Sequence, residues 1–260
     1  MSNPTVVVLH AHPDDEAIFT GATIRHLADG GARVVLVTAT GGERGVPRRP
    51  LPRGESVGGR RIAELERACE LLGVARLVLL GFHDSGAHRG PYASRSLGAA
   101  PTSAVAARLA AVVVETERAD ALVHYDRRGI YGHVDHVQVH RAGAAVAERL
   151  GVPGYEATVD AEALRVGPRH VLQQAAGEAL DAGEPRHAIT LTVRAGTSGL
   201  LAKMAAMAAH ASQIGPEYLD HARFEAAYGQ EWFVHRGVGG PLEEVLREHV
   251  TARMPAVMAG

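Results

Sequence analysis

The 260-residue sequence has little of several features that mark common classes of protein. It has one cysteine, Cys69, so an internal disulfide is excluded, and we expect this thiol in or near the core. Lys203 is the only lysine and the formal net charge is −2, so the composition predicts neither a nucleic-acid nor an anionic-membrane partner. No apolar stretch has the length that spans a bilayer, and the N-terminus lacks the basic segment of a signal peptide. We therefore expect a cytoplasmic protein.

The apolar residues that are present alternate between strand-like and helix-like segments. With 46 % hydrophobic residues, the chain is long enough to bury a large core. The β-branched runs predict strands and the segments with helical periodicity predict crossover helices, so we expect an α/β fold whose mostly parallel sheet has helices on both faces. The expected strands are 5–9, 33–38, 77–80, 121–124, 155–159, 189–193 and 231–235, and the expected helices are 17–29, 60–72, 102–117, 134–150, 169–180, 198–211 and 241–254.

No repeat or linker divides the sequence. We therefore expect one domain over residues 1–260, in which residues 1–150 form the core and residues 151–260 form a C-terminal extension packed on it. Two segments, 39–59 and 86–100, are expected to be long loops. Loops of this length in a compact domain are usually functional or disordered, and the role of these two stays open.

The first polar cluster, His12-Pro13-Asp14-Asp15-Glu16, directly follows the apolar run 6–9. In an open α/β sheet the carboxyl end of a strand is where ligands bind. A strand-to-helix turn in which one carboxylate caps the helix is the simpler alternative, but it explains only one of the three acidic residues. The turn also lacks the glycine-rich pattern of a dinucleotide site, which argues against NAD.

The second cluster, Tyr131-Gly132-His133-Val134-Asp135-His136, follows another predicted strand and begins a helix, so His133 and His136 lie on one face. Two imidazoles and a carboxylate are the ligand set of a catalytic zinc, and His12, Asp15 and His136 are the best three. The same set suits ferrous iron. Asp14 is then free to act as a base near the metal, and His133 is a second acid/base group.

Together these two motifs resemble those of the PIG-L/LmbE-like N-deacetylases. Members of that family are zinc enzymes on a Rossmann-like fold, and they remove acetyl from N-acetylglucosaminyl compounds. Weaker similarities extend over residues 5–235, and the mycothiol branch, with its deacetylase and its conjugate amidase, is the nearest. The resemblance implies an N-acetylated aminosugar as the substrate, an active site at the carboxyl ends of the strands, zinc on His12, Asp15 and His136, and Asp14 as the general base.

The resemblance also implies roles for five further residues. His133 would stabilise the tetrahedral oxyanion or protonate the leaving amine, and Asp135 would orient it. Tyr131 would assist at the carbonyl group. Arg61 and Asp84 match positions that hold sugar hydroxyls.

The substrate is not determined by these motifs. Deacetylation in thiol-cofactor synthesis, amidase activity on a mycothiol-type conjugate, and tailoring of a glycosylated natural product all fit the residues. A metal phosphoesterase and a non-catalytic sugar- or nucleotide-binding module are the rivals outside the family. The alanine-rich helices would allow a homo-oligomer.

Three isolated residues have only general expectations. His10 is expected to pack or to support a ligand from behind, and Glu16 to favour the helix start or to bond a ligand histidine. His210 is expected to lie outside the pocket, because isolated histidines seldom act in a site.

Overall fold

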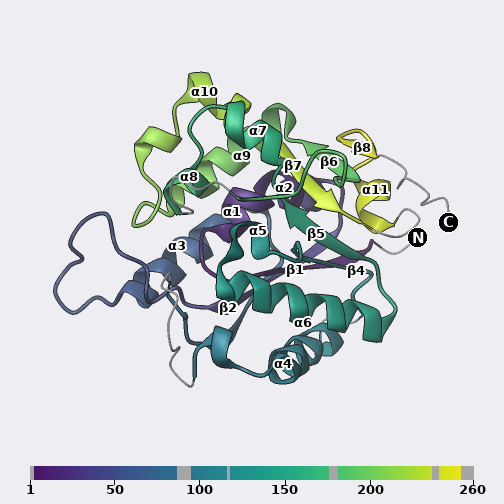
Figure 1. Ribbon diagram of the computed structural model, residues 1–260, viewed down its shortest axis with the longest axis horizontal. Coiled ribbons are helices and arrows are strands. Elements are labelled where there is room, and N and C mark those ends of the chain that lie inside the picture. Colours follow the sequence, from purple (N-terminus) through teal and green to yellow (C-terminus); the bar gives the residue numbers. More distant parts are fainter. Residues whose placement is uncertain (1–2, 87–94, 116–117, 176–180, 236–239, 253–260) are drawn as a thin grey trace.

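The computed structural model describes residues 3–86, 95–115, 118–175, 181–235 and 240–252, and within them the strands form one eight-stranded sheet (Figure 1). Strands β3, β2, β1, β4 and β5 lie side by side in that order and are parallel, and β7, β6 and β8 continue the sheet in antiparallel fashion. The bounds are β1 Thr5–His10, β2 Arg33–Thr40, β3 Arg76–Phe82, β4 Ala121–Tyr125, β5 Gly154–Thr158, β6 Leu191–Arg194, β7 Gln230–Val234 and β8 Val250–Ala252.

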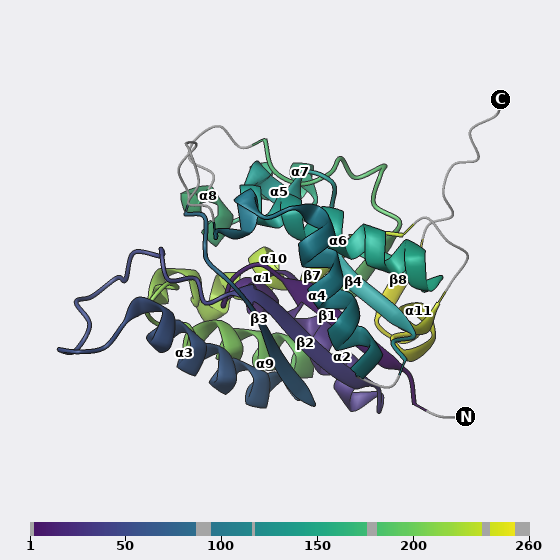
Figure 2. The same ribbon diagram turned by 90° about the horizontal axis from the view of Figure 1, so that it is seen from below.

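Helices cover both faces of this sheet. In Figure 2, α2, α3 and α9 lie below the strands, and α4 and α6 lie above them. The helices are α1 Asp15–Phe19, α2 Gly21–Asp29, α3 Val57–Leu72, α4 Thr102–Glu115, α5 Gly129–Gly132, α6 Val134–Leu150, α7 Ala161–Val166, α8 Val171–Ala175, α9 Gly196–Ala209, α10 His221–Tyr228 and α11 Pro241–Val245, with 3-10 turns at Leu97–Ala99 and Pro216–Tyr218. The predicted Rossmann-like α/β fold with a mostly parallel sheet is confirmed.

The central strands consist of β-branched and leucine side chains with no exposed surface. Val6, Val7, Val8 and Leu9 of β1 are completely buried, because β1 pairs with β2 on one side and β4 on the other while helices cover both faces. Parallel strands buried on both faces have continuous apolar runs of this kind. The most regular apolar runs of the sequence therefore form the centre of the core.

The single helix predicted over residues 17–29 is wrong. Thr20 separates α1 from α2, and its hydroxyl bonds back to the Glu16 carbonyl at 3.1 Å. The new helix start is capped from a distant strand, because both oxygens of the Glu231 carboxylate accept hydrogen bonds, from the N–H groups of Ala22 and Thr23 at 2.8 Å each. The sequence around Thr20 holds no sign of this long-range cap.

The C-terminal helix predicted over residues 241–254 is also wrong. It ends at Val245 after five residues, and β8 then pairs antiparallel with β6, with Thr251 opposite Thr192. Apolar spacing of three and four fits one helical turn as well as a long helix, whereas the β-branched pair Val250-Thr251 favours an edge strand. Residues 253–254, and the ends 176–180 and 116–117 of two other predicted helices, lie outside the described residues.

The order of the strands reverses at the centre of the sheet. From β1 the chain moves outward through β2 and β3, and β4 then returns to the other side of β1. A crevice forms outside the carboxyl ends of strands at such a switch point, and ligands bind there. His12 follows β1, and residues 126–136 follow β4, so both polar clusters of the sequence lie at this point.

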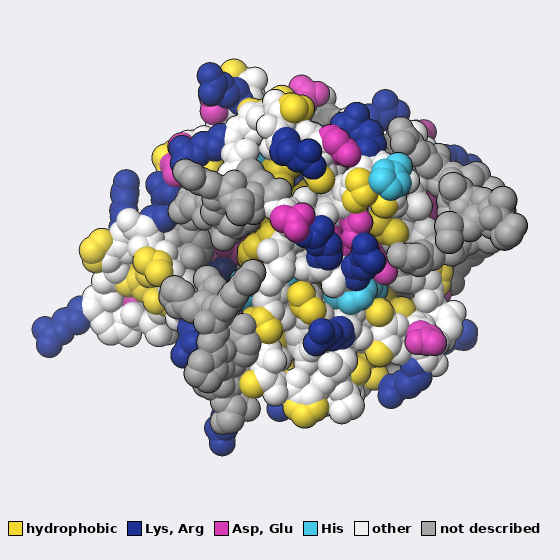
Figure 3. Space-filling model, viewed as in Figure 1, with side chains coloured by type: hydrophobic (Ala, Val, Ile, Leu, Met, Phe, Trp, Pro, Cys, Tyr) yellow, Lys and Arg dark blue, Asp and Glu magenta, His cyan; other side chains and the backbone are white. Residues whose placement is uncertain are grey.

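Across the described ranges, none of the helices combines the length and the apolar character that a bilayer crossing requires. On the face in Figure 3, basic and acidic side chains are interspersed near the centre.

Candidate metal centre and active site

Three potential metal ligands converge at the switch point. His12 Nδ1 lies 3.4 Å from Asp15 Oδ2, His136 Nε2 lies 3.4 Å from the same oxygen, and the two nitrogens are 3.3 Å apart. His12 comes from the turn after β1, Asp15 from the first residue of α1, and His136 from the first turn of α6. The predicted ligands are therefore brought together from segments 124 residues apart.

The spacing of these atoms fits a metal ion. Zinc is bound by nitrogen and oxygen at about 2.0–2.1 Å, and tetrahedral geometry then places the ligand atoms about 3.3 Å from one another. The Asp135 carboxylate accepts a hydrogen bond from His12 Nε2 at 3.2 Å, which leaves His12 Nδ1 with its lone pair toward the other two ligands. The ring of His136 stacks on Tyr125 with centroids 4.3 Å apart. Its buried Nδ1 has no partner among the described residues.

The electrostatics favour a cation at this position. Burial alone lowers the pKa of His12, but hydrogen bonds to Asp135, Asp15 and Asp84 together raise it well above its usual value. Opposing effects also act on the pKa of Asp15: burial raises it, but His136 and His12 together lower it well below its usual value. A cluster with several carboxylates around one imidazole attracts positive charge, and a metal ion satisfies it as a proton does.

Other groupings of the same side chains also have their ligand atoms within 4.8 Å of one another. They are His12 with His133 and His136, and His12 with Asp84, His133 and Asp135. Both share His12 and His133, so they are variants of one centre and not a second metal site. We favour the set with Asp15, because its interatomic distances match a tetrahedral site.

The Asp135 carboxylate and the Asp135 backbone N–H contact different histidines. The carboxylate binds His12 and also accepts hydrogen bonds from the Ser85 N–H at 2.9 Å and the Ser85 hydroxyl at 2.5 Å. It is the backbone N–H of Asp135 that donates to His133 Nδ1 at 3.2 Å, because His133 caps helix α6. Asp135 thus supports a ligand histidine.

His133 and Tyr131 lie beside the ligand set. The His133 ring is 4.8 Å from His12 and 5.2 Å from His136, measured between centroids. Burial and the two neighbouring imidazoles lower the pKa of His133 to about 3. Since its Nδ1 accepts a hydrogen bond, the neutral ring carries its proton on Nε2 and can donate. The Tyr131 ring is 5.0 Å from His136, and burial raises the pKa of its hydroxyl well above the usual value.

Asp14 has a backbone conformation that only its surroundings can maintain. Its φ is 110°, in the left-handed region that favours glycine. Arg61 forms an ion pair with the Asp14 carboxylate at 3.0 Å and also donates to the Pro13 carbonyl at 2.5 Å. Burial raises the pKa of Asp14 to about 6, against the lowering effect of Arg61. A carboxylate with a raised pKa next to a metal ligand is suited to accept a proton.

Arg61 and Asp84 lie in the site but are turned toward the protein. Besides its contacts with Asp14 and Pro13, Arg61 donates to the Gly42 carbonyl at 2.9 Å. One Asp84 oxygen lies 3.5 Å from His12 Nε2 and accepts from the Gly86 N–H, and the other accepts from the Arg44 N–H at 3.2 Å. The contact of Arg61 and Asp84 with sugar hydroxyls stays a prediction.

Sequence reasoning missed Tyr125. This fully buried tyrosine ends β4, and its hydroxyl donates to Asp15 Oδ2 at 2.7 Å. The Tyr125 hydroxyl oxygen in turn accepts a hydrogen bond from the Ala11 N–H at 3.0 Å and lies 3.0 Å from His10 Nδ1, so His10 supports Asp15 indirectly, through Tyr125. The carboxyl-end position of Tyr125 on its strand was the available signal. His124, its neighbour, points to the opposite face and packs under Gly143 of α6.

Sequence reasoning also underestimated His210. His210 Nε2 lies 2.6 Å from Glu16 Oε1, and both side chains are completely buried. The other oxygen of Glu16 accepts the Asp14 N–H at 3.0 Å. Glu16 is thus neither a simple helix-start carboxylate nor the partner of a ligand histidine.

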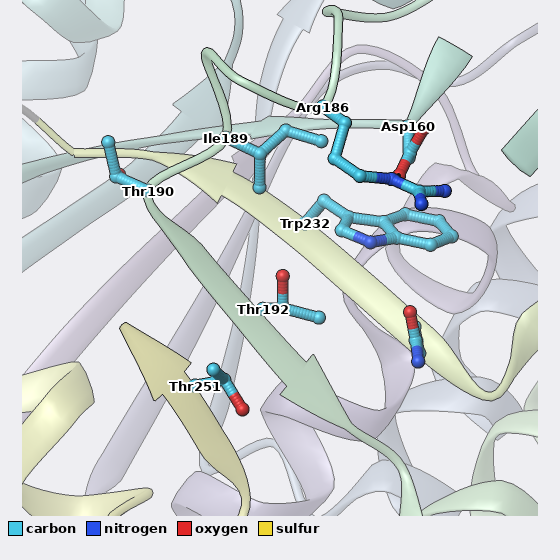
Figure 4. A pocket seen from close by; sticks show the side chains of 8 residues that line it. Asp160, Arg186, Ile189, Thr190, Thr192, Trp232 and Thr251 are labelled. Atoms are coloured by element: carbon cyan, nitrogen blue, oxygen red, sulfur yellow. Dashed lines mark hydrogen bonds and ion pairs between the residues drawn. The ribbon is translucent and has the colours of Figure 1, made fainter. Parts of the chain in front are cut away.

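A separate polar hollow is lined by Trp232 and other side chains of β6, β7 and β8 (Figure 4). Arg186 Nε pairs with Asp160 at 2.7 Å at its upper edge, Thr190 lies at the upper left, and Thr192 of β6 and Thr251 of β8 lie below. None of the metal-centre residues lines this hollow.

The comparisons with known proteins agree with this geometry. The family model described as PIG-L, GlcNAc-PI de-N-acetylase, matches residues 7–147. Proteins named 1D-myo-inositol 2-acetamido-2-deoxy-alpha-D-glucopyranoside deacetylase are similar to this chain, two of them over most of its length. The one from Acidothermus cellulolyticus is 33 % identical over 98 % of this chain and 97 % of its own, and the one from Thermomonospora curvata is 34 % identical over 88 % and 89 %.

Solved structures share the fold at low sequence identity. The A40926 pseudoaglycone deacetylase Dbv21 has a TM-score of 0.62 at 18 % identity, over 92 % of this chain and 100 % of that one. The 4-carboxy-2-hydroxymuconate hydratase GalB from Pseudomonas putida, with a TM-score of 0.59 and 18 % identity over 91 % and 97 %, shows that the fold also carries other reactions. The motif match and the full-length relatives decide the family: the chain belongs to the PIG-L family.

Proposed function

We propose that this protein is a metal-dependent N-deacetylase, which hydrolyses the acetamide of an N-acetylglucosaminyl small molecule to acetate and a free amine. The observation that carries the proposal is the triangle of His12 Nδ1, Asp15 Oδ2 and His136 Nε2, with the Asp14 carboxylate on the adjacent residue. Zinc is the proposed metal, and ferrous iron suits the same ligands. The metal would supply a Lewis acid and a nucleophile that is competent near neutral pH.

The protein's own groups account for the proton transfers. Asp14 accepts a proton from the water that attacks the acetyl carbon, and it returns this proton to the nitrogen as the C–N bond breaks. The His133 Nε2–H donates a hydrogen bond to the carbonyl oxygen as that oxygen gains negative charge. Because the pKa of Tyr131 is raised, its hydroxyl stays protonated and can donate to the same oxygen.

The substrate we propose to test first is the compound named in the relatives, 1D-myo-inositol 2-acetamido-2-deoxy-alpha-D-glucopyranoside. Amidase activity on a mycothiol-type conjugate is the alternative within the family. A phosphoesterase with two metals is disfavoured, because the groupings of ligand atoms in the described residues share His12 and His133. We also propose that residues 1–260 act as one domain, which the continuous sheet supports. A homo-oligomer and a cytoplasmic location stay predictions.

Release of free amine from this compound, measured in the purified protein and two variants, tests the proposal. Asp14→Asn should lower kcat by about 10²–10⁴-fold with the metal content unchanged, because only the base is removed. His136→Ala should lose the metal itself, as measured by elemental analysis. Substantial turnover in Asp14→Asn would refute the assignment of the base, and full metal content in His136→Ala would refute the ligand set.

A further inference from the structure

The strained backbone conformation of Asp14 must be stabilised by contacts with its surroundings. A non-glycine residue in such a conformation is strained and persists only where its surroundings fix it. Arg61 holds the Asp14 side chain, at 3.0 Å from the carboxylate. The backbone is held separately, because the Asp14 N–H donates to Glu16 Oε2 at 3.0 Å. The direction of the Asp14 carboxylate therefore depends on where the Glu16 side chain lies.

Glu16 is in turn held from a distant part of the chain. Its second oxygen lies 2.6 Å from Nε2 of His210, which caps the C-terminal end of α9 and is 194 residues away in the sequence. Each oxygen of the carboxylate has one partner, so the group cannot rotate without breaking a hydrogen bond. Both side chains have no exposed surface, and water cannot replace a bond that is lost there.

Among the described residues, the imidazole of His210 makes one hydrogen bond, the one to Glu16. Its Nδ1 is buried and has no partner within the described ranges. A histidine kept only for packing could be replaced by an apolar residue without leaving a buried nitrogen unsatisfied. The geometry thus indicates a side chain whose purpose is its contact with Glu16.

We propose that His210 is a positioning residue for the hydrolysis: acting through Glu16, it fixes the backbone of Asp14 and so aims the catalytic carboxylate at the attacking water. The inference rests on the proposed function, since it takes Asp14 as the base. Helix α9 lies against α1 and α3, so this contact connects the C-terminal part of the chain to the catalytic turn.

The test compares His210→Ala with His210→Gln. The glutamine amide can still donate to Glu16, whereas alanine cannot. With 1D-myo-inositol 2-acetamido-2-deoxy-alpha-D-glucopyranoside as the probe, His210→Ala should lower kcat by about 10–100-fold, the range for lost supporting contacts in metal sites. KM and metal content should stay unchanged, and His210→Gln should recover most of kcat.

A matched control is His170→Ala. His170 is also buried, but it packs on Tyr228 with ring centroids 4.5 Å apart, and its Nδ1 accepts a hydrogen bond from the Leu172 N–H and not from the catalytic turn. This variant should lose stability and keep kcat.

Three results would overturn the proposal: an unchanged kcat in His210→Ala, a loss in His210→Gln as large as in His210→Ala, or a loss of activity that follows loss of metal. Asp14→Asn separates the two hypotheses. If Asp14→Asn stays active, the proposed base fails. If Asp14→Asn is inactive while His210→Ala is unimpaired, only the role of His210 fails.

Discussion

The buried ion pair between Lys203 and Glu231 connects three elements that are far apart in the sequence. Lys203 Nζ of α9 lies 2.6 Å from Glu231 Oε1 of β7, and each side chain is 1 % exposed. The Glu231 carboxylate also accepts the first N–H groups of α2, from Ala22 and Thr23. Replacing Lys203 with methionine keeps the apolar stem and removes the ammonium group, so a buried carboxylate remains with only two N–H partners.

The size of the effect follows from this burial. Removing one partner of a buried ion pair costs about 3–5 kcal/mol, because the remaining charge is uncompensated. For a chain of this size, 1 kcal/mol lowers Tm by about 2–4 °C, so Lys203→Met should lower Tm by about 6–20 °C. Glu231→Gln should also destabilise the protein. The double variant should be less unstable than the sum of both singles by about 1–3 kcal/mol.

Urea unfolding followed by circular dichroism measures these free energies. Arg67→Met is the control, because Arg67 pairs with Glu70 on the surface of α3 with side chains 62 % and 68 % exposed. Its loss should cost at most about 0.5 kcal/mol. A loss below about 1 kcal/mol in Lys203→Met, or strict additivity in the double variant, would refute the reasoning, because an uncompensated buried charge costs more than this.

Two further predictions concern groups near the catalytic turn and the sheet. Asp135→Asn weakens the hydrogen bond that supports His12, so metal affinity should fall by about 10–100-fold, as measured by competition with a chelator. A lower kcat at unchanged metal affinity would instead indicate that Asp135 takes part in the reaction. Burial lowers the pKa of His124 to about 4, below its usual value of 6.5. The contribution of neutral His124 to the unfolding free energy is therefore complete above pH 6.5 and falls as the pH falls toward 4. His124→Asn keeps a donor for the Tyr125 carbonyl and should reduce the pH dependence of the unfolding free energy in that range by up to about 1.4 kcal/mol per pH unit. An unchanged slope would show that His124 is protonated in the folded protein over this range.

The strands and long helices were predictable because their signals are local. The β-branched runs of β1 and β2 and the helical spacing of α6 lie within a few turns of chain, and the structure places them with small differences at the ends. Short elements such as α7 and α10 were not predicted, because too few residues show a period. The helix expected over residues 241–254 failed for a different reason, because residues 250–252 pair with the edge of β6 as strand β8.

In the candidate site, too, some relations between residues follow from local sequence and others from the tertiary structure. The sequence by itself determined that His12 and Asp15 leave one strand together and that His133 and His136 begin one helix, since spacing within a turn fixes these relations. Strand order decided that the two clusters meet. Parallel strands placed side by side bring their carboxyl ends to one edge of the sheet, however far apart they are in the sequence.

Only the tertiary structure decided how each polar group is used. Asp135 lies two residues after His133 in the sequence, yet its carboxylate binds His12, and Glu16 pairs with His210 across 194 residues. A buried carboxylate must bond the donor that packing brings to it, because an unsatisfied charge costs several kcal/mol. The motif therefore determined which groups the site contains, and the packing of α9 and the strand order determined which of them hold the others in place.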